Sequence, residues 1–229
     1  MKLLDKPIFG TLVKRYKRFF SDVLVEGETV VAHTPNTGPM TTCWEKDMVC
    51  VLSESNNPDR KLKYTLELTK NDETYILVNT HRPNKIIQES LEKKEIPELI
   101  FDKVVSEYKI GNSRFDFYAE KGAEKFLIEV KNVSTKKDDY AIFPDTRSER
   151  ALKHVEELTR LQSEGYQCVL LFLISRNDCS KFRPSKEIMA DYHESCVAAH
   201  KAGVKLMAIE YKISPEEISY LKQIPVDLL

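Results

Sequence analysis

Hydrophobic and polar residues alternate in short runs over the first third of the chain, a pattern typical of β-strands. Turn-forming residues separate these runs, most densely in the segment HTPNTGPM at residues 33–40. The strands expected here cover residues 10–20, 23–33 with a turn near 26–28, 48–52, 64–68 and 74–78. Short strands joined by turns, without a long helix, predict a small β-barrel.

The pattern changes after Pro83, where Ile86, Ile87 and Leu91 recur at helical spacing. The elements expected in order are a helix at 85–94, strands at 104–110, 114–120 and 125–133, a helix at 146–163, a strand at 167–175, a helix at 186–202 and a strand at 204–211. The near-continuous apolar run at 167–175 is typical of a buried sheet centre. This order predicts an α/β domain with a mixed sheet. We therefore expect two domains, at residues 1–82 and 83–229.

Composition narrows the class of protein. The chain has 229 residues, of which 41% are hydrophobic and 31% charged, and its formal net charge is −1. Such a balance gives no overall attraction to a polyanion, so any nucleic-acid binding must come from a local basic patch.

The five cysteines show no CxxC spacing, which favours free thiols in a reducing compartment. The N-terminus lacks the apolar core of a signal peptide, and the longest apolar run is too short to span a bilayer. We expect a cytoplasmic protein without a membrane partner.

The strongest local signal for chemistry lies on two neighbouring expected strands. Side chains on a strand alternate between its faces, so Glu129 and Lys131 share one face of the strand at 125–133. Asp116 takes the polar face of the strand at 114–120. If the two strands pair as a hairpin, the three polar side chains converge.

Such a cluster suits metal-dependent hydrolysis of phosphodiester bonds. Asp116 and Glu129 would hold Mg²⁺ or Mn²⁺, because hard cations prefer carboxylate oxygens and retain several waters. Lys131 would orient water or stabilise the negative charge of the transition state. The alternative is an ordinary salt bridge, since a Glu-x-Lys pattern on a strand often arises by chance.

The helix expected next offers two supporting residues. Arg150 and His154 are four residues apart and lie on one helix face, from which they could approach a phosphate or hold the carboxylates. A solvated helix face is the alternative. Thr146 and Glu149 have capping-box spacing, and Asp145 is expected to serve as an N-terminal cap and not as a metal ligand.

A basic and aromatic segment near the N-terminus is the second signal. Cations neutralise phosphates and aromatic rings stack on bases, so such a pattern is typical of a nucleic-acid-binding groove. The residues expected to bind nucleic acid are Lys14, Arg15, Tyr16, Lys17 and Arg18, extended by Arg60 and Lys61. The alternative is an edge strand whose charges prevent aggregation.

These motifs together resemble the sugar fermentation stimulation protein A family along almost the whole chain. The matching residues are 14–19, 33, 36–38, 40, 57–58, 60–61, 80, 82–84, 113–114, 116, 129–131, 143–145, 150 and 153–154. The resemblance implies an N-terminal OB-like barrel, a restriction-endonuclease-like C-terminal domain of the PD-(D/E)xK type, DNA binding, and a link to the regulation of sugar catabolism in bacteria. By position, Asp116, Glu129 and Lys131 match the nuclease motif, although Phe115 stands where that motif has proline.

Three functions remain open from the sequence. The first is a Mg²⁺- or Mn²⁺-dependent nuclease that acts on DNA, with the barrel gripping the strand. The second is a DNA-binding regulator of sugar-catabolism genes without catalysis, because a fold does not determine a function. The third is a protein-interaction module whose basic segments are solvated surface. An intact set of two acids and a lysine favours the first, since a pure binder does not need two carboxylates facing a polyanion.

Overall fold

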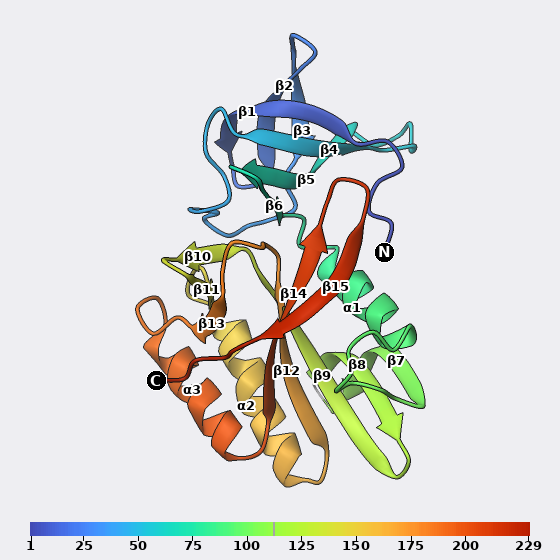
Figure 1. The fold of residues 1–229 in the computed structure, drawn as a ribbon, viewed down its shortest axis with the longest axis vertical. Coiled ribbons are helices and arrows are strands. Elements are labelled where there is room, and N and C mark those ends of the chain that lie inside the picture. Colours follow the sequence, from blue (N-terminus) through green and yellow to red (C-terminus); the bar gives the residue numbers. More distant parts are fainter. Residues whose placement is uncertain (112) are drawn as a thin grey trace.

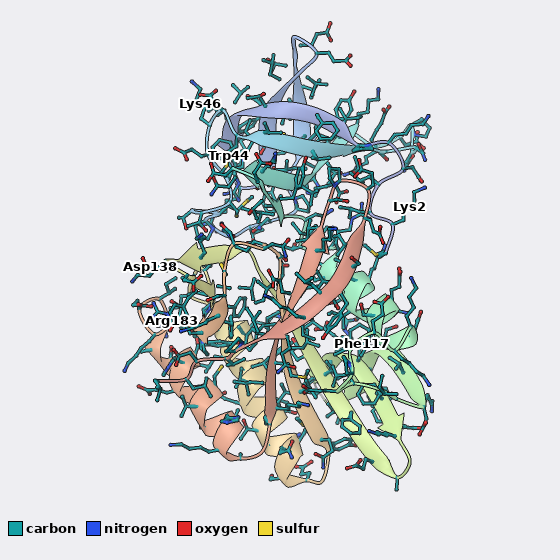
Figure 2. All side chains as sticks on the ribbon, in the orientation of Figure 1. Lys2, Trp44, Lys46, Phe117, Asp138 and Arg183 are labelled. Atoms are coloured by element: carbon teal, nitrogen blue, oxygen red, sulfur yellow. The ribbon has the colours of Figure 1, made fainter. Side chains whose placement is uncertain are left out.

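The computed structural model describes residues 1–111 and 113–229. A β-barrel lies above a mixed sheet that is flanked by helices (Figure 1), and side chains fill the space between these layers (Figure 2). The first residues of the chain descend from the barrel, and the Met1 amino group donates a hydrogen bond to the Ile218 carbonyl (2.6 Å). Leu3 and Leu4 are therefore buried in the core of the lower half. Across the described residues, no helix has the length and apolar character needed to cross a membrane.

The barrel is built from the strands that the alternating pattern predicts. Its strands are β1 (Ile8–Tyr16), β2 (Phe20–Val25), β3 (Glu28–His33), β4 (Val49–Glu54), β5 (Tyr64–Asn71) and β6 (Thr74–Leu77). They follow the order β3-β2-β1-β4-β5-β6, and pairing of β3 with β5 closes the barrel. Alternate residues such as Leu12, Val23 and Leu66 point inward to form its core. The predicted OB-like barrel is confirmed.

The strand expected over residues 10–20 is divided by a turn. Lys17 and Arg18 have positive φ angles of 50° and 64°, and Tyr16 pairs with Phe20 across the hairpin. The β-rich composition hid this turn, because neither residue is a usual turn former. Lys17 and Arg18 therefore project from the tip of a hairpin, whereas Lys14 and Arg15 lie on strand β1.

The lower half contains a six-stranded sheet between two helical layers. Its elements are α1 (Pro83–Glu92), β7 (Lys103–Ile110), β8 (Ser113–Lys121), β9 (Glu124–Val133), β10 (Thr135–Lys137), β11 (Tyr140–Phe143), α2 (Glu149–Ser163), β12 (Gln167–Ile174), β13 (Lys181–Pro184), α3 (Ala190–Lys201), β14 (Lys205–Ile213) and β15 (Ile218–Ile224). The sheet order is β15-β14-β12-β9-β8-β7, and only β9, β12 and β14 are mutually parallel. The mixed α/β sheet predicted from the sequence is confirmed.

The two faces of this sheet are buried against different helices. Ile86 and Leu91 of α1 share a core with Ile128 and Leu171, whereas α2 and α3 cover the opposite face of the sheet. Since successive residues of β9 and β12 point to opposite faces, both faces need apolar side chains. This double burial explains the continuous apolar run of β12.

Several element boundaries differ from the expected ones. Helix α2 is capped by Ser148, whose side chain accepts a hydrogen bond from the Ala151 N–H (3.2 Å), so the expected capping box at Thr146 is wrong. Asp145 lies outside the helix and does not cap it. Helix α3 starts at Ala190, since residues 186–188 form a turn. Four strands were not predicted: β10, β11 and β13 are too short to show a period, and β15 is mostly polar.

Candidate active site

The candidate site lies where strands β8 and β9 stop pairing. Their register runs from Lys121 opposite Glu124 to Phe117 opposite Ile128. Immediately beyond this point, Asp116 Oδ2 accepts a hydrogen bond from the backbone N–H of Val130 (2.7 Å). The carboxylate thus accepts the hydrogen bond that a backbone carbonyl of β8 would accept in a regular pair. It links the two strands at the point where they diverge. Local sheet geometry therefore fixes the position of Asp116.

Glu129 lies next to this separation point and is almost fully buried, with 3% of its surface exposed. Its Oε1 accepts a hydrogen bond from Lys131 Nζ at 2.6 Å and is also in contact with His154 Nδ1 of helix α2. Its Oε2 is buried without a hydrogen-bond partner in the described residues. Buried carboxylate oxygens are normally satisfied, so this atom marks a position suited to a further ligand.

The charges of the two carboxylates are coupled. Burial, followed by the negative charge of Glu129, raises the pKa of Asp116 to about 6. Burial also raises the pKa of Glu129, but hydrogen bonding from His154 and the charge of Lys131 outweigh it, so that this pKa lies below its ordinary value. Glu129 is therefore stabilised as an anion by its neighbours, whereas the charge of Asp116 is disfavoured by burial and by Glu129. A nearby cation would favour the ionised form of Asp116.

The residues present fit a hard divalent cation. Asp116 and Glu129 offer carboxylate oxygens, of which Glu129 Oε2 has no partner within the described residues. Residues 1–111 and 113–229 contain no cluster of three or more His, Cys, Asp or Glu side chains placed to surround a metal. Two carboxylates with the remaining positions left to water or phosphate suit Mg²⁺ better than a metal that needs a full protein cage.

The supporting residues on α2 differ in their contacts. His154 touches Glu129, so it holds the carboxylate directly. Arg150 is exposed and lines a surface hollow with Arg114, Lys153 and His154. The structure therefore brings Asp116, Glu129, Lys131 and His154 together, while Arg150 lies at the edge of this group.

Asn84 is a site residue to which the sequence analysis gave no role. Its side chain donates a hydrogen bond to Asp116 Oδ1 (2.6 Å) from the first turn of α1. The only sequence signal was its place in the Arg82-Pro83-Asn84 motif of the family resemblance. Its contact joins elements 32 positions apart, which no local pattern reveals.

The basic residues expected to bind nucleic acid are divided by the structure into two groups. Lys14, Lys17, Arg18 and Lys61 are exposed and form no ion pair with a carboxylate in the described part of the chain. Arg15 is half buried and donates hydrogen bonds to the carbonyls of residues 18, 36, 38 and 39. Arg15 therefore holds the loop at residues 36–39 against the hairpin.

The other two members of the expected set are partly engaged within the barrel. Tyr16 stacks on Phe20, with ring centroids 5.5 Å apart. Arg60 donates a hydrogen bond to Thr65 Oγ1 (2.7 Å). These contacts leave the exposed lysines and Arg18 as the cations most available to phosphates.

Three surface hollows lie at or near the candidate site. One lies between the barrel and the lower half, has a volume of about 390 Å³ and includes Thr80 and His81 in its wall. A second shares Thr80 and His81 and is also lined by Asp116. The third lies along α2 beside His154. The first two hollows therefore share part of their walls, and together they extend from the barrel to Asp116.

Comparison with known proteins gives matches over both halves. Residues 13–78 match the family model described as "SfsA N-terminal OB domain", and residues 81–217 match "Sugar fermentation stimulation protein RE domain". A sugar fermentation stimulation protein homolog of Bdellovibrio bacteriovorus is 38% identical over 95% of this chain and 96% of its own length. A homolog of Pelagibacter ubique is 39% identical over 99% of both chains. The solved structure of Pyrococcus furiosus SfsA in complex with Ca²⁺ has a TM-score of 0.90 at 24% identity, with 99% of both chains covered.

Proposed function

The chain belongs to the sugar fermentation stimulation protein family, and from this premise we propose that it binds DNA and hydrolyses phosphodiester bonds with the help of Mg²⁺ or Mn²⁺. One observation carries the proposal: Asp116 and Glu129 are near enough for the charge of Glu129 to raise the pKa of Asp116, and the buried Glu129 Oε2 has no partner in the described residues. Fold alone would not support catalysis.

Each residue of the site has a distinct role in this proposal. Asp116 and Glu129 would hold the cation, while Asn84 and the Val130 N–H keep Asp116 in place. When bound, the cation supplies positive charge to the scissile phosphate and increases the acidity of a nearby water. The Lys131 ammonium would turn from Glu129 toward the phosphate and stabilise the charge of the transition state.

A related structure supports the choice of a divalent ion. The solved Pyrococcus furiosus protein is described as a complex with Ca²⁺. Ca²⁺ and Mg²⁺ both take oxygen ligands, so a site for one has the donor chemistry of the other. The two carboxylates of this chain provide such donors.

The binding surface would extend over the hairpin tip of the barrel. Lys14, Lys17, Arg18 and Lys61 are exposed cations that can neutralise phosphates. The five cysteines are buried free thiols, which supports a reducing compartment such as the cytoplasm, where DNA is present.

A second candidate function is a DNA-binding regulator without catalysis. The observation that favours it is the ion pair between Lys131 and Glu129, whose side chains are only 11% and 4% exposed. In this alternative the ion pair is permanent and neither group reaches a phosphate. The barrel and its basic hairpin would then carry the whole function.

Cleavage of labelled DNA with Mn²⁺ separates these functions. We expect Glu129→Gln and Lys131→Ala each to lower the cleavage rate about a hundredfold or more, as loss of a transition-state contact does. Glu124→Gln and Lys125→Ala provide matched controls, because both residues are exposed on the same strand. Cleavage no faster in the wild type than in the Glu129 and Lys131 variants would exclude the nuclease. Salt-independent binding of the oligonucleotide would exclude both DNA functions.

A further inference from the structure

The hollow of about 390 Å³ between the barrel and the lower half has the size of a ligand-binding pocket, and we call it the base pocket. Resting on the proposed function, we propose that it binds an unstacked guanine base of the strand whose phosphate lies at Asp116 and Glu129. The pocket then makes single-stranded or locally opened nucleic acid the substrate class. It also makes Asp145 a specificity-determining residue.

The position of the pocket links it to the acidic site. Its wall includes Thr80 and His81, which also line the hollow that contains Asp116. Asn132, which follows Lys131 on β9, lies in the same wall. A nucleotide with its phosphate at the carboxylates therefore has the base pocket within reach of a neighbouring base.

Two aromatic side chains, one from each half of the protein, line the pocket. Phe19 stands at the β1–β2 hairpin tip and is 46% exposed, although aromatic side chains are usually buried. Phe143 is held from behind by Phe172 and Tyr192, with ring centroids at 6.2 and 5.5 Å. Unpaired bases are commonly bound by stacking on such rings. Exposure of Phe19 is explained if its partner is a base.

The polar group of the pocket is the Asp145 carboxylate. It is half-buried, and burial raises its pKa, yet no other residue in the described part of the chain donates a hydrogen bond to it. Gly38 leaves room for this carboxylate, because a Cβ atom at that position would lie 2.2 Å from Asp145 Oδ2. Arg15 is nearby, but its terminal nitrogens donate to backbone carbonyls. Asp145 therefore offers acceptor oxygens to a ligand in the pocket.

The charge of the pocket excludes a phosphate as its occupant. The Asp145 carboxyl group lines the pocket, and burial together with nearby Arg60 and His81 lowers the pKa of His33, which disfavours the charged form of this ring. A neutral ligand with hydrogen-bond donors fits this wall better than an anion. Bases meet that requirement, whereas the backbone of the strand does not.

Guanine is the base that matches a carboxylate. Its Watson–Crick edge carries two adjacent donors, N1–H and the N2 amino group, which can donate to the two oxygens of an ionised carboxylate. Adenine and cytosine place an acceptor beside their amino group, and thymine flanks its single donor with two acceptors. These three bases would each set an acceptor against Asp145, and leaving a buried acceptor without a donor is costly.

A binding assay without divalent metal tests the proposal. Oligothymidylates that carry one central guanine, inosine, adenine or cytosine are titrated by fluorescence anisotropy in the presence of EDTA with the whole protein. We expect the guanine strand to bind about tenfold more tightly than the other strands, a factor within the range for bidentate recognition of a base. Inosine lacks the N2 amino group, so it should lose most of this preference.

Variants assign the preference to Asp145. Asp145→Asn should reduce the guanine preference to about twofold or less, while Asp138→Asn makes the same change of charge at an exposed turn on the outer edge of the lower half (Figure 2) and should retain it. Equal affinity for all strands, or equal affinity for guanine and inosine, overturns the proposal even if Asp145→Asn does not fold. Cleavage with Mn²⁺ but without guanine preference would refute the base pocket alone, and guanine preference without cleavage would refute the nuclease alone.

Discussion

Asp116 stabilises the local strand geometry through a hydrogen bond, but its negative charge is unfavourable in a buried position. Its carboxylate replaces a backbone acceptor for Val130 and so fixes the point where two strands separate. The same burial that allows this contact raises its pKa to about 6. An ionised Asp116 therefore destabilises the metal-free fold at neutral pH, a common property of functional sites.

This cost predicts a pH dependence of stability. Because the folded pKa lies above the unfolded value, the folded state binds a proton more tightly, and its free energy of unfolding should increase as pH falls from 7 toward 5. In Asp116→Asn the free energy of unfolding should increase by about 1 to 2 kcal/mol less over this pH range than in the wild type. The hydrogen bond lost in the variant lowers stability at every pH and does not change this difference. Urea unfolding of EDTA-treated protein at several pH values measures it. A variant whose stability follows pH as steeply as the wild type would show that Asp116 is already neutral or fully solvated.

Sequence reasoning at the residue scale identified the acids but not their surroundings. The charges of Asp116, Glu129 and Lys131 do interact, as the hairpin prediction required. The strict alternation assumed for the first strand does not hold at Asp116, because Phe115 and Phe117 pack in the cores on opposite faces of the sheet. Two contacts between distant parts of the chain were not predicted. Asn84 donates a hydrogen bond to Asp116, and Arg15 holds the loop at residues 36–39. No local pattern contains that information.

At the scale of elements, long periodic segments were predicted well and their ends poorly. Strand β12 and helix α2 followed from many apolar residues acting together, so one atypical residue does not change the assignment. A helix start depends on one side chain. Asp145, Thr146 and Ser148 all have side chains that can cap a helix, and only the backbone conformation decides between them.

The cap of α2 gives a test at this scale. Ser148→Ala should lower the free energy of unfolding by about 1 kcal/mol, since the Ala151 N–H loses its acceptor. Thr146→Ala is the matched control, and because Thr146 is exposed outside the helix it should change stability by less than about 0.5 kcal/mol. Thermal and urea unfolding of both variants distinguishes them. A larger loss for Thr146→Ala would instead restore the capping box expected from the sequence.

At the scale of the whole molecule, contacts between the barrel and the start of helix α1 help to position the candidate site. Glu67 of β5 is 1% exposed and accepts hydrogen bonds from Ser53, Asn79 and Arg82. Arg82 immediately precedes α1, whose Asn84 holds Asp116. The barrel thus sets the position of the helix that supports the acidic group. Sequence periodicity predicted both halves but not this connection, since a single buried ion pair leaves no repeating pattern.

The Glu67–Arg82 pair therefore should affect stability and the site together. Arg82→Met leaves a buried carboxylate without its counter-charge and should lower the free energy of unfolding at pH 7 by about 3 kcal/mol. Lys85→Met, at an exposed position of the same helix, should have little effect. Adding Glu67→Gln to Arg82→Met should recover part of the loss, because a neutral amide tolerates burial better than an unpaired anion.

The pH dependence separates this ion pair from a simple packing contact. Burial raises the pKa of Glu67, but hydrogen bonds from Arg82 and Ser53 outweigh it and leave the pKa below its ordinary value. Its contribution is present above the unfolded pKa and disappears as pH falls through the folded pKa, so the difference between wild type and Arg82→Met should shrink below about pH 4. A difference that stays constant from pH 7 to pH 3 would mean that Arg82 acts through its aliphatic stem. Cleavage by Arg82→Met should also be slower than by the wild type, since Asn84 then no longer holds Asp116 in place.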